Sequence, residues 1–248
     1  MLIPVKSLPS NFKPYKFKHF NMKAMSLQQA IDLGKNPTLK DITKLLQILV
    51  GDEIDASALV PVDVRYLLAM LSFHAYPKQS WTLELTCPHC KDKHKRSITM
   101  QDFPPVPSLT DDDPYPLTID DGKHVWELGY PSVEAWDDMV SKLGMSRNTD
   151  ISELNPATFV DLVTPYILKV DGTAENIREK VLEIDDFGVL NVMLEAIKAY
   201  FLDDTEAEFE CPKCKKKYSV ALSALEVTQY TPFLDKAATS RYKVNFRL

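Results

Sequence analysis

The chain repeats itself at an offset of 124 residues, half of its length of 248. At this offset eight identities fall between positions 75 and 93 without a gap. The identical pairs are Ala75/Ala199, Tyr76/Tyr200, Glu84/Glu208, Cys87/Cys211, Pro88/Pro212, Cys90/Cys214, Lys91/Lys215 and Lys93/Lys217. Beyond this block the match continues with similar residues, such as Ile98 over Leu222. Such self-similarity indicates two copies of one supersecondary unit.

Each copy predicts a helix followed by a β-hairpin. Apolar residues recur at the i, i+3, i+4, i+7 spacing of one buried helical face. These residues are Tyr66, Ala69, Met70 and Phe73 in the first copy and Leu190, Met193, Leu194 and Ile197 in the second. Apolar and polar residues then alternate on both sides of each cysteine pair, through Trp81, Leu83, Leu85, Ile98 and Met100 and through Ala207, Phe209, Val220 and Leu222. We expect two hairpins with cysteines at their tips.

The organisation predicted from these patterns is an α+β fold with an internal duplication. Helix plus zinc-knuckle hairpin units would be related by a pseudo-twofold axis and joined by a Pro/Asp-rich linker. Upstream, each half begins with a predicted strand and helix, at 15–20 and 27–33 and at 125–128 and 133–143. We place the first repeat unit at 1–103, the linker at 104–124, the second unit at 125–228 and a C-terminal docking tail at 229–248. We interpret the acidic residues Asp111–Asp113 of the linker as solvent-exposed charges and assign them no function.

The four cysteines form two Cys-Pro-x-Cys knuckles, and there are no others in the chain. Cys87, Cys90, Cys211 and Cys214 together offer the four thiolates that a tetrahedral structural zinc ion prefers. A pseudo-twofold axis would bring the two knuckles together despite their separation in sequence. Two alternatives remain, a redox Cys-x-x-Cys pair and cysteines kept as buried thiols. A redox pair normally sits in a thioredoxin-like βαβ pattern, which the sequence lacks.

No catalytic constellation accompanies the cysteines. Four protein ligands leave no open position on zinc for water, and no nucleophile elbow or phosphate-binding glycine loop occurs. His89 inside the first knuckle corresponds to Lys213 in the second, so we interpret it as a solvent-facing spacer. His94 corresponds to Tyr218, and we assign it no ligand role. We expect a protein that is not an enzyme and has no small-molecule substrate.

Charge and hydropathy limit the remaining functions. A net charge of −6 disfavours binding to nucleic acid or anionic lipid by bulk charge. The sequence contains no apolar run long enough to cross a membrane and does not start like a signal peptide, so we expect a cytoplasmic site of synthesis. Lysines flank both knuckles, so a zinc-ribbon protein that binds nucleic acid is an alternative function. An acidic protein partner is the other possibility for these lysines.

The C-terminal segment 229–248 is too apolar to be left in solvent. Its aromatic residues are Tyr230, Phe233, Tyr242 and Phe246. We expect them to dock on the core or on a partner protein.

Two segments resemble a known family. Residues 59–68 (LVPVDVRYLL) open a helix that leads to the knuckle at 85–90 (LTCPHC), and Leu8-Pro9-Ser10 followed by Tyr15 stands near the start. This order resembles the T-even-type bacteriophage baseplate proteins, the hub subunits and hub-assembly factors of contractile tails. The resemblance extends through about residue 103.

The resemblance implies a structural or assembly part of the baseplate hub. It implies hub and tape-measure proteins as partners, and the tail baseplate of the virion, assembled in the host cytoplasm, as the location. A hub-assembly chaperone that is absent from the mature virion is an alternative within this class. The alternative from another class is the zinc-ribbon protein that binds nucleic acid or assists transcription.

Overall fold

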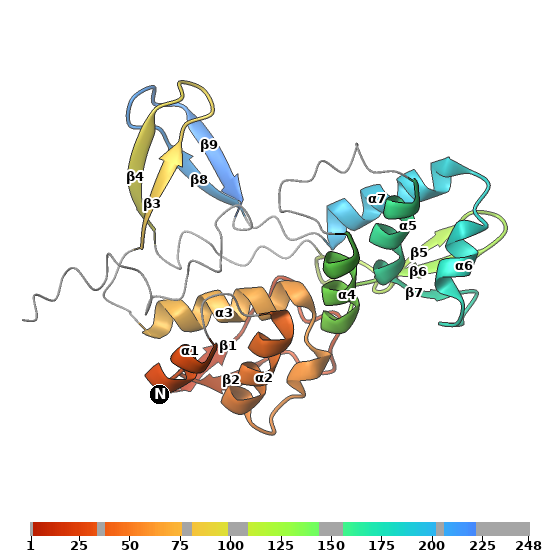
Figure 1. Cartoon of the computed structure of the whole chain (residues 1–248), viewed down its shortest axis with the longest axis horizontal. Coiled ribbons are helices and arrows are strands. Elements are labelled where there is room, and N and C mark those ends of the chain that lie inside the picture. Colours follow the sequence, from red (N-terminus) through yellow and green to blue (C-terminus); the bar gives the residue numbers. More distant parts are fainter. Residues whose placement is uncertain are drawn as a thin grey trace, which may run out of the picture.

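The computed structural model describes residues 2–33, 38–75, 81–98, 109–143, 156–201 and 206–221. Its elements form an N-terminal group of helices on a two-stranded sheet, a three-stranded sheet with helices, and a pair of β-hairpins (Figure 1). All the strand pairs are antiparallel. The predicted α+β class is therefore confirmed.

The first group contains two short strands and three α-helices. They are β1 (Leu2–Val5), β2 (Phe20–Lys23), α1 (Leu27–Leu33), α2 (Leu39–Val50), the 3-10 helix η1 (Ala56–Ala58) and α3 (Pro61–Ala75). The predicted helix at 27–33 is confirmed, but the strand predicted at 15–20 starts only at Phe20. Before Phe20 the backbone bonds within turns, as between the Tyr15 N–H and the Phe12 carbonyl at 3.0 Å. Backbone N–H and carbonyl groups that bond within these turns are not aligned to pair with a neighbouring β-strand.

Helix α2 shows how sequence fixes an element of this group. Thr38 caps its N-terminus, accepting from the Asp41 N–H at 3.2 Å while the Asp41 side chain accepts from the Thr38 N–H. This reciprocal pair satisfies donors that a helix start leaves free. Gly51 ends the helix with φ of 64°. The buried residues Leu39, Ile42, Leu45, Leu46, Leu49 and Val50 form one face. The capping residues and the apolar periodicity indicate the same start and end for this helix. The bounds of α2 therefore follow from its local sequence.

Helix α3 lies at the centre of the first core. Tyr66, Leu67 and Leu68 are consecutive and all buried, as are Met70 and Leu71. Consecutive residues point about 100° apart on a helix, so α3 is covered on more than one side. The sequence pattern had predicted one buried face.

Near the start of α3 a buried carboxylate holds the N-terminal segment. Asp63 accepts hydrogen bonds from the N–H and Oγ of Ser10, at 3.0 and 2.6 Å, and from the Tyr15 hydroxyl at 2.6 Å. The Tyr15 hydroxyl also accepts from the Val60 N–H at 2.8 Å. Burial, reinforced by Asp63, raises the pKa of Tyr15 well above its ordinary value. These bonds offset the cost of burying a charged group.

The second group is a three-stranded sheet with helices. Its elements are β5 (Leu117–Asp120), β6 (Val125–Leu128), α4 (Val133–Leu143), α5 (Pro156–Val163), the 3-10 helix η4 (Thr164–Tyr166), β7 (Ile167–Val170), α6 (Ile177–Leu182) and α7 (Phe187–Tyr200). The strand order is β5-β6-β7. The strand at 125–128 and the helix at 133–143 are as predicted. Helix α7 buries Leu190, Met193, Leu194 and Ile197, which confirms the predicted stripe.

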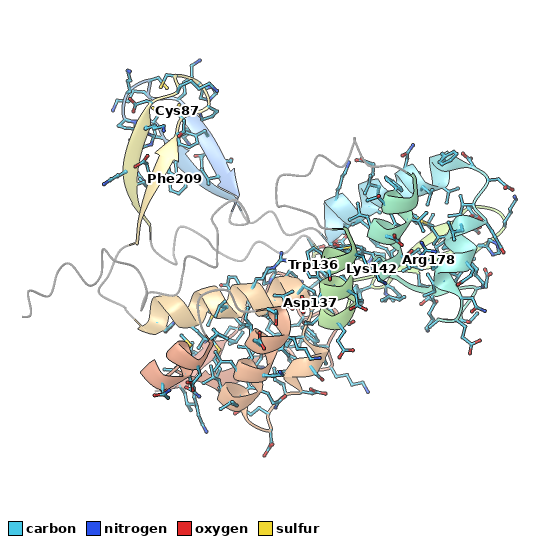
Figure 2. All side chains as sticks on the ribbon, viewed as in Figure 1. Cys87, Trp136, Asp137, Lys142, Arg178 and Phe209 are labelled. Atoms are coloured by element: carbon cyan, nitrogen blue, oxygen red, sulfur yellow. The ribbon has the colours of Figure 1, made fainter. Side chains whose placement is uncertain are left out.

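Helix α4 contributes to both cores. Val133 belongs to the first core, and Trp136 packs against both. The Arg65 guanidinium of α3 lies 4.8 Å from the centre of the Trp136 ring, a cation–π distance. Figure 2 shows Trp136 and Asp137 on α4, beside α3. Contacts of this kind join the two groups of helices.

The segment predicted to be a linker contributes to the second core. Within its described part, residues 109–124, strand β5 pairs with β6 and Leu109 is fully buried. The carbonyls of Asp111 and Asp113 accept from the Lys13 ammonium at 2.8 and 2.7 Å. Residues of the segment placed in the linker therefore form a strand of the second group. Backbone pairing with β6, which lies later in the chain, is the reason.

Duplication of the whole repeat unit is not shown by the arrangement of the helices. Helix α3 is surrounded by the first core, whereas α7 buries a single stripe. The domain division given above therefore stays a prediction. Within the described ranges, no helix combines the length and apolar character that crossing a membrane requires.

Candidate metal centre

The two cysteine-bearing hairpins have the same strand register. Strand β3 (Trp81–Thr86) pairs with β4 (Lys93–Ile98), and β8 (Glu206–Glu210) pairs with β9 (Lys217–Ala221). Thr86 lies opposite Lys93, and Glu210 lies opposite Lys217, which are the equivalent positions at the 124-residue offset. The two hairpins lie against one another (Figure 1). Both predicted hairpins, with cysteines at the tip, are thereby confirmed.

The two knuckles also share their backbone hydrogen bonds. The Cys87 N–H donates to the Asp92 carbonyl, and the Lys91 N–H donates to the Cys87 carbonyl, both at 2.9 Å. At the offset of 124 the same two bonds recur at 3.0 Å, from Cys211 to the Lys216 carbonyl and from Lys215 to the Cys211 carbonyl. Lys91 and Lys215 have positive φ values of 59° and 60°. Identical turns therefore present both cysteine pairs.

All four sulfurs meet where the hairpin tips join. The Sγ atoms of Cys87 and Cys214 are 3.7 Å apart, and those of Cys90 and Cys211 are 3.6 Å apart. All four lie within 4.8 Å of one another. Figure 2 shows Cys87 at the tip and Phe209 farther down, between the hairpins. Four sulfurs 2.3 Å from a tetrahedral zinc ion would be about 3.8 Å apart, so the cluster fits such an ion.

Backbone donors favour ionisation of one cysteine in each knuckle. Burial would raise the pKa of Cys87, but the N–H groups of Cys90 and His89 stabilise its thiolate and lower the pKa to about 7. The Cys214 N–H does the same for Cys211, lowering its pKa against the effect of burial. These donors suit thiolates that bind a metal.

Burial and the neighbouring sulfurs oppose ionisation of Cys90. The Asp92 N–H favours the Cys90 thiolate, but burial and the sulfurs of Cys214, Cys211 and Cys87 together raise its pKa to about 12. Four thiolates at these distances repel one another, and a divalent cation is what would let all four ionise together.

Further contacts hold the hairpins together. The Arg96 guanidinium lies 5.5 Å from the centre of the Phe209 ring, and Phe209 is 2% exposed. Lys213 Nζ lies 3.8 Å from Asp92 Oδ1. His89 is exposed, as predicted for a spacer, with Nε2 3.2 Å from the Lys217 carbonyl oxygen.

Two residues beside the sulfurs, His94 and Tyr218, carry no signal in the sequence that assigns them a role. The Tyr218 hydroxyl lies 2.9 Å from His94 Nε2, and the two rings are edge to face. A ring nitrogen of His94, a carboxylate oxygen of Asp92 and the Cys211 sulfur lie within 4.8 Å of one another. His94 and Tyr218 are equivalent at the 124-residue offset. Residues that meet their own equivalent lie near a local twofold axis, and which of the many equivalent pairs does so depends on how the two hairpins pack.

The predicted partner-binding residues are not part of this centre. Tyr230, Phe233, Tyr242 and Phe246 lie outside the described residues. Their role stays a prediction.

The fold and the centre together define an α+β protein with a four-cysteine module made of two equivalent hairpins. The sequence model of the T4 bacteriophage base plate protein family matches residues 2–226. The chain belongs to this family of baseplate structural proteins. No curated protein and no solved structure gives a match to the chain.

Proposed function

We propose that the chain is a structural or assembly component of the baseplate hub of a contractile phage tail, acting through contacts with other tail proteins. Membership of the baseplate family over residues 2–226 is the observation that carries this proposal. That family implies other baseplate proteins as partners. The hub is the finer assignment, and it comes from the resemblance of residues 59–68 and 85–90.

The module would be stabilised by one structural zinc ion on Cys87, Cys90, Cys211 and Cys214. The sulfur separations of 3.6 and 3.7 Å support this assignment, as do the backbone N–H groups that face the sulfurs. A zinc ion with four protein thiolates has no free position for substrate or water. Its role is to fix the two hairpins, which are far apart in sequence, in one orientation. Metal-binding energy at such a site is folding energy.

The lysines of the module fit a protein contact better than a nucleic-acid contact. Eight Lys or Arg residues and five Asp or Glu residues occur in 81–98 and 206–221, which gives these hairpins a net charge of +3. A zinc ion with four thiolates carries a formal charge of −2, which nearby lysines partly neutralise. The rings of Phe209 and Tyr218 are buried, at 2% and 7% exposure, and therefore cannot stack on bases. We accordingly favour an acidic protein surface as the target of the lysines.

The zinc assignment is tested by elemental analysis of the full chain purified without chelator. We expect a zinc-to-chain ratio near one. A ratio near two, or no metal at all, would contradict a single shared site.

The assembly role is tested by affinity purification from phage-infected cells together with mass spectrometry of purified particles. We expect hub or tape-measure proteins to co-purify and to be lost when residues 229–248 are deleted. Presence in particles would indicate a virion part, and absence would indicate an assembly factor. Recovery of polymerase or nucleic acid alone would overturn the proposal in favour of the nucleic-acid alternative.

A further inference from the structure

The second group of helices carries an exposed apolar surface. Leu182, the last residue of α6, and Phe187, the first residue of α7, are 55% and 66% exposed. Ile184 lies between them in the chain and is only partly buried. We call residues 182–187 the α6–α7 corner. Apolar side chains that gather on a surface among polar groups mark a site of interaction.

Carboxylates flank the α6–α7 corner. Residues 171–187 contain six Asp or Glu residues and two Lys or Arg residues, which gives a net charge of −4. Both cations are already paired, Arg178 with Asp161 at 3.0 Å (Figure 2) and Lys180 with Asp171 at 3.6 Å. The exposed carboxylates that make neither an ion pair nor a hydrogen bond with the described residues are Glu175, Glu179 and Glu183. The corner is therefore an apolar surface with negative charge beside it.

Residues 2–23 form a surface of the opposite charge. They contain five lysines and no Asp or Glu residue. Lys13 donates to the carbonyls of Asp111 and Asp113. The lysines that are exposed and pair with no carboxylate in the part of the chain that the structure describes are Lys6, Lys16, Lys18 and Lys23. Four positive charges are therefore available to an acidic partner.

A hollow opens on this positive surface, beside the end of the β1–β2 sheet. It measures about 400 Å³, and its lining includes Pro4 and Phe20 as apolar walls and Lys6 and Lys18 as cations. A neighbouring hollow of about 420 Å³ shares Lys18 but also contains Asp111, whose charge offsets that of the lysines. The first hollow is therefore the better match for an apolar side chain accompanied by carboxylates.

The two surfaces do not meet within one chain. Among the residues with described positions, no ion pair joins 2–23 to 171–187. In Figure 1, β1 and β2 lie beneath α3 in the first group, and α6 lies on the far side of the second group. An apolar side chain that fits a hollow elsewhere on the same molecule makes a head-to-tail contact between copies. A foreign acidic partner would cover residues 2–23 but leave the α6–α7 corner exposed.

We propose that copies of this chain associate head to tail, with the α6–α7 corner of one copy docked on residues 2–23 of the next. Phe187 enters the hollow beside the β1–β2 sheet. Glu179 and Glu183 face the lysines that line this hollow. Two surfaces of this size form a small interface, so the association is weak and sensitive to salt. The inference depends on neither the zinc ion nor the hub assignment.

The test measures association of the full chain by sedimentation velocity at about 10 to 500 µM, in low and in high salt. One variant reverses the charge of the corner, with Glu179→Lys and Glu183→Lys. Another reverses the receiving surface, with Lys6→Glu and Lys18→Glu. We expect the parent chain to associate in low salt and to associate less in high salt.

Each charge-reversed variant alone should stay monomeric, because the charged side chains that meet then have the same sign. A mixture of the two variants should associate again, because each corner then meets a surface of opposite charge. Recovery in the mixture separates charge pairing from damage to the fold, and circular dichroism verifies that every variant is folded.

Phe187→Ala should weaken the association by about tenfold or more, as truncation of a central aromatic residue at an interface does. The matched control is Lys40→Glu with Lys44→Glu, which reverses two exposed charges of α2 outside both surfaces. The control should stay within about twofold of the parent chain, as exposed substitutions usually do.

A parent chain that stays monomeric at about 500 µM in low salt would overturn the proposal. Folded charge-reversed variants that associate like the parent chain would also overturn it, as would a mixture of the two that stays monomeric. A monomeric parent chain that binds a polyglutamate peptide, and loses this binding on Lys6→Glu with Lys18→Glu, would assign residues 2–23 to a foreign acidic partner instead.

Discussion

The Sγ atom of Cys87 lies 3.7 Å from that of Cys214, 127 residues later in the chain. The equivalent pair, Cys90 and Cys211, is 3.6 Å apart. Each close pair takes one sulfur from each knuckle, so neither knuckle can complete the cluster alone. This crossed pairing makes the two knuckles interdependent.

Cys87→Ser and Cys211→Ser should therefore weaken the module to a similar degree. Each removes one of four zinc ligands, and we expect each to lower the free energy of unfolding by more than about 3 kcal/mol. Urea unfolding followed together with zinc content provides the measurement. Ser219→Ala, at an exposed position of β9, should change the free energy by less than about 0.5 kcal/mol. A large loss in only one cysteine variant would indicate that one knuckle suffices.

Tyr15→Phe should destabilise the first core by about 1–3 kcal/mol. The substitution removes a 2.6 Å hydrogen bond to the buried Asp63 carboxylate and leaves the Val60 N–H without its acceptor. The free energy of unfolding in urea measures the effect. Tyr200→Phe is the control, because the Tyr200 hydroxyl makes no hydrogen bond with the described residues. Equal effects of the two substitutions would show that the hydrogen bond from Tyr15 to Asp63 makes no net contribution to the free energy of unfolding.

Asp171→Asn should reduce stability at neutral pH but not in acid. The Val125 N–H and the His124 ring hydrogen bond to the Asp171 carboxylate at 2.9 and 2.8 Å and hold its pKa below the ordinary value of 3.8. A lowered pKa contributes stability that is fully present above pH 3.8 and is lost as the pH falls through the folded-state value.

The difference in urea midpoint between Asp171→Asn and the parent chain is measured at pH 7 and near pH 3. We expect it to shrink at the lower pH. Asp112→Asn, at an exposed carboxylate, is the control. A difference that stays constant would show that the charge of Asp171 is not the cause.

An experimental structure should superpose residues 57–103 on 181–227 as helix-plus-hairpin units related by an approximate twofold rotation. The shared hairpin register and the shared knuckle hydrogen bonds support this prediction for the hairpins. The decisive measurement is the placement of each helix relative to its own hairpin. Different topologies of the two segments would refute duplication of the whole unit.

The local elements were predictable because their signals lie in neighbouring residues. The bounds of α1, α4 and β6 agree with the predicted ranges, and α7 buries the predicted stripe. The hairpins followed from alternation around each cysteine pair. The strand at 15–20 failed because the Tyr15 hydroxyl bonds to Asp63, far along the chain, and the local backbone bonds within turns. Aromatic residues favour a β-strand, but they do not by themselves provide a second strand with which the segment could pair.

The sequence by itself determined that two equivalent knuckles exist, because their residue types and spacing recur at one offset. It also determined that the cysteines lie at the tips of the hairpins, because strand alternation and turn residues are features of neighbouring residues. Only the tertiary structure decided that Cys87 meets Cys214, that β5 joins the second core and that His94 meets Tyr218. These contacts depend on how distant segments pack. Packing energy is spread over many residues, so it leaves no signature in any short stretch of sequence.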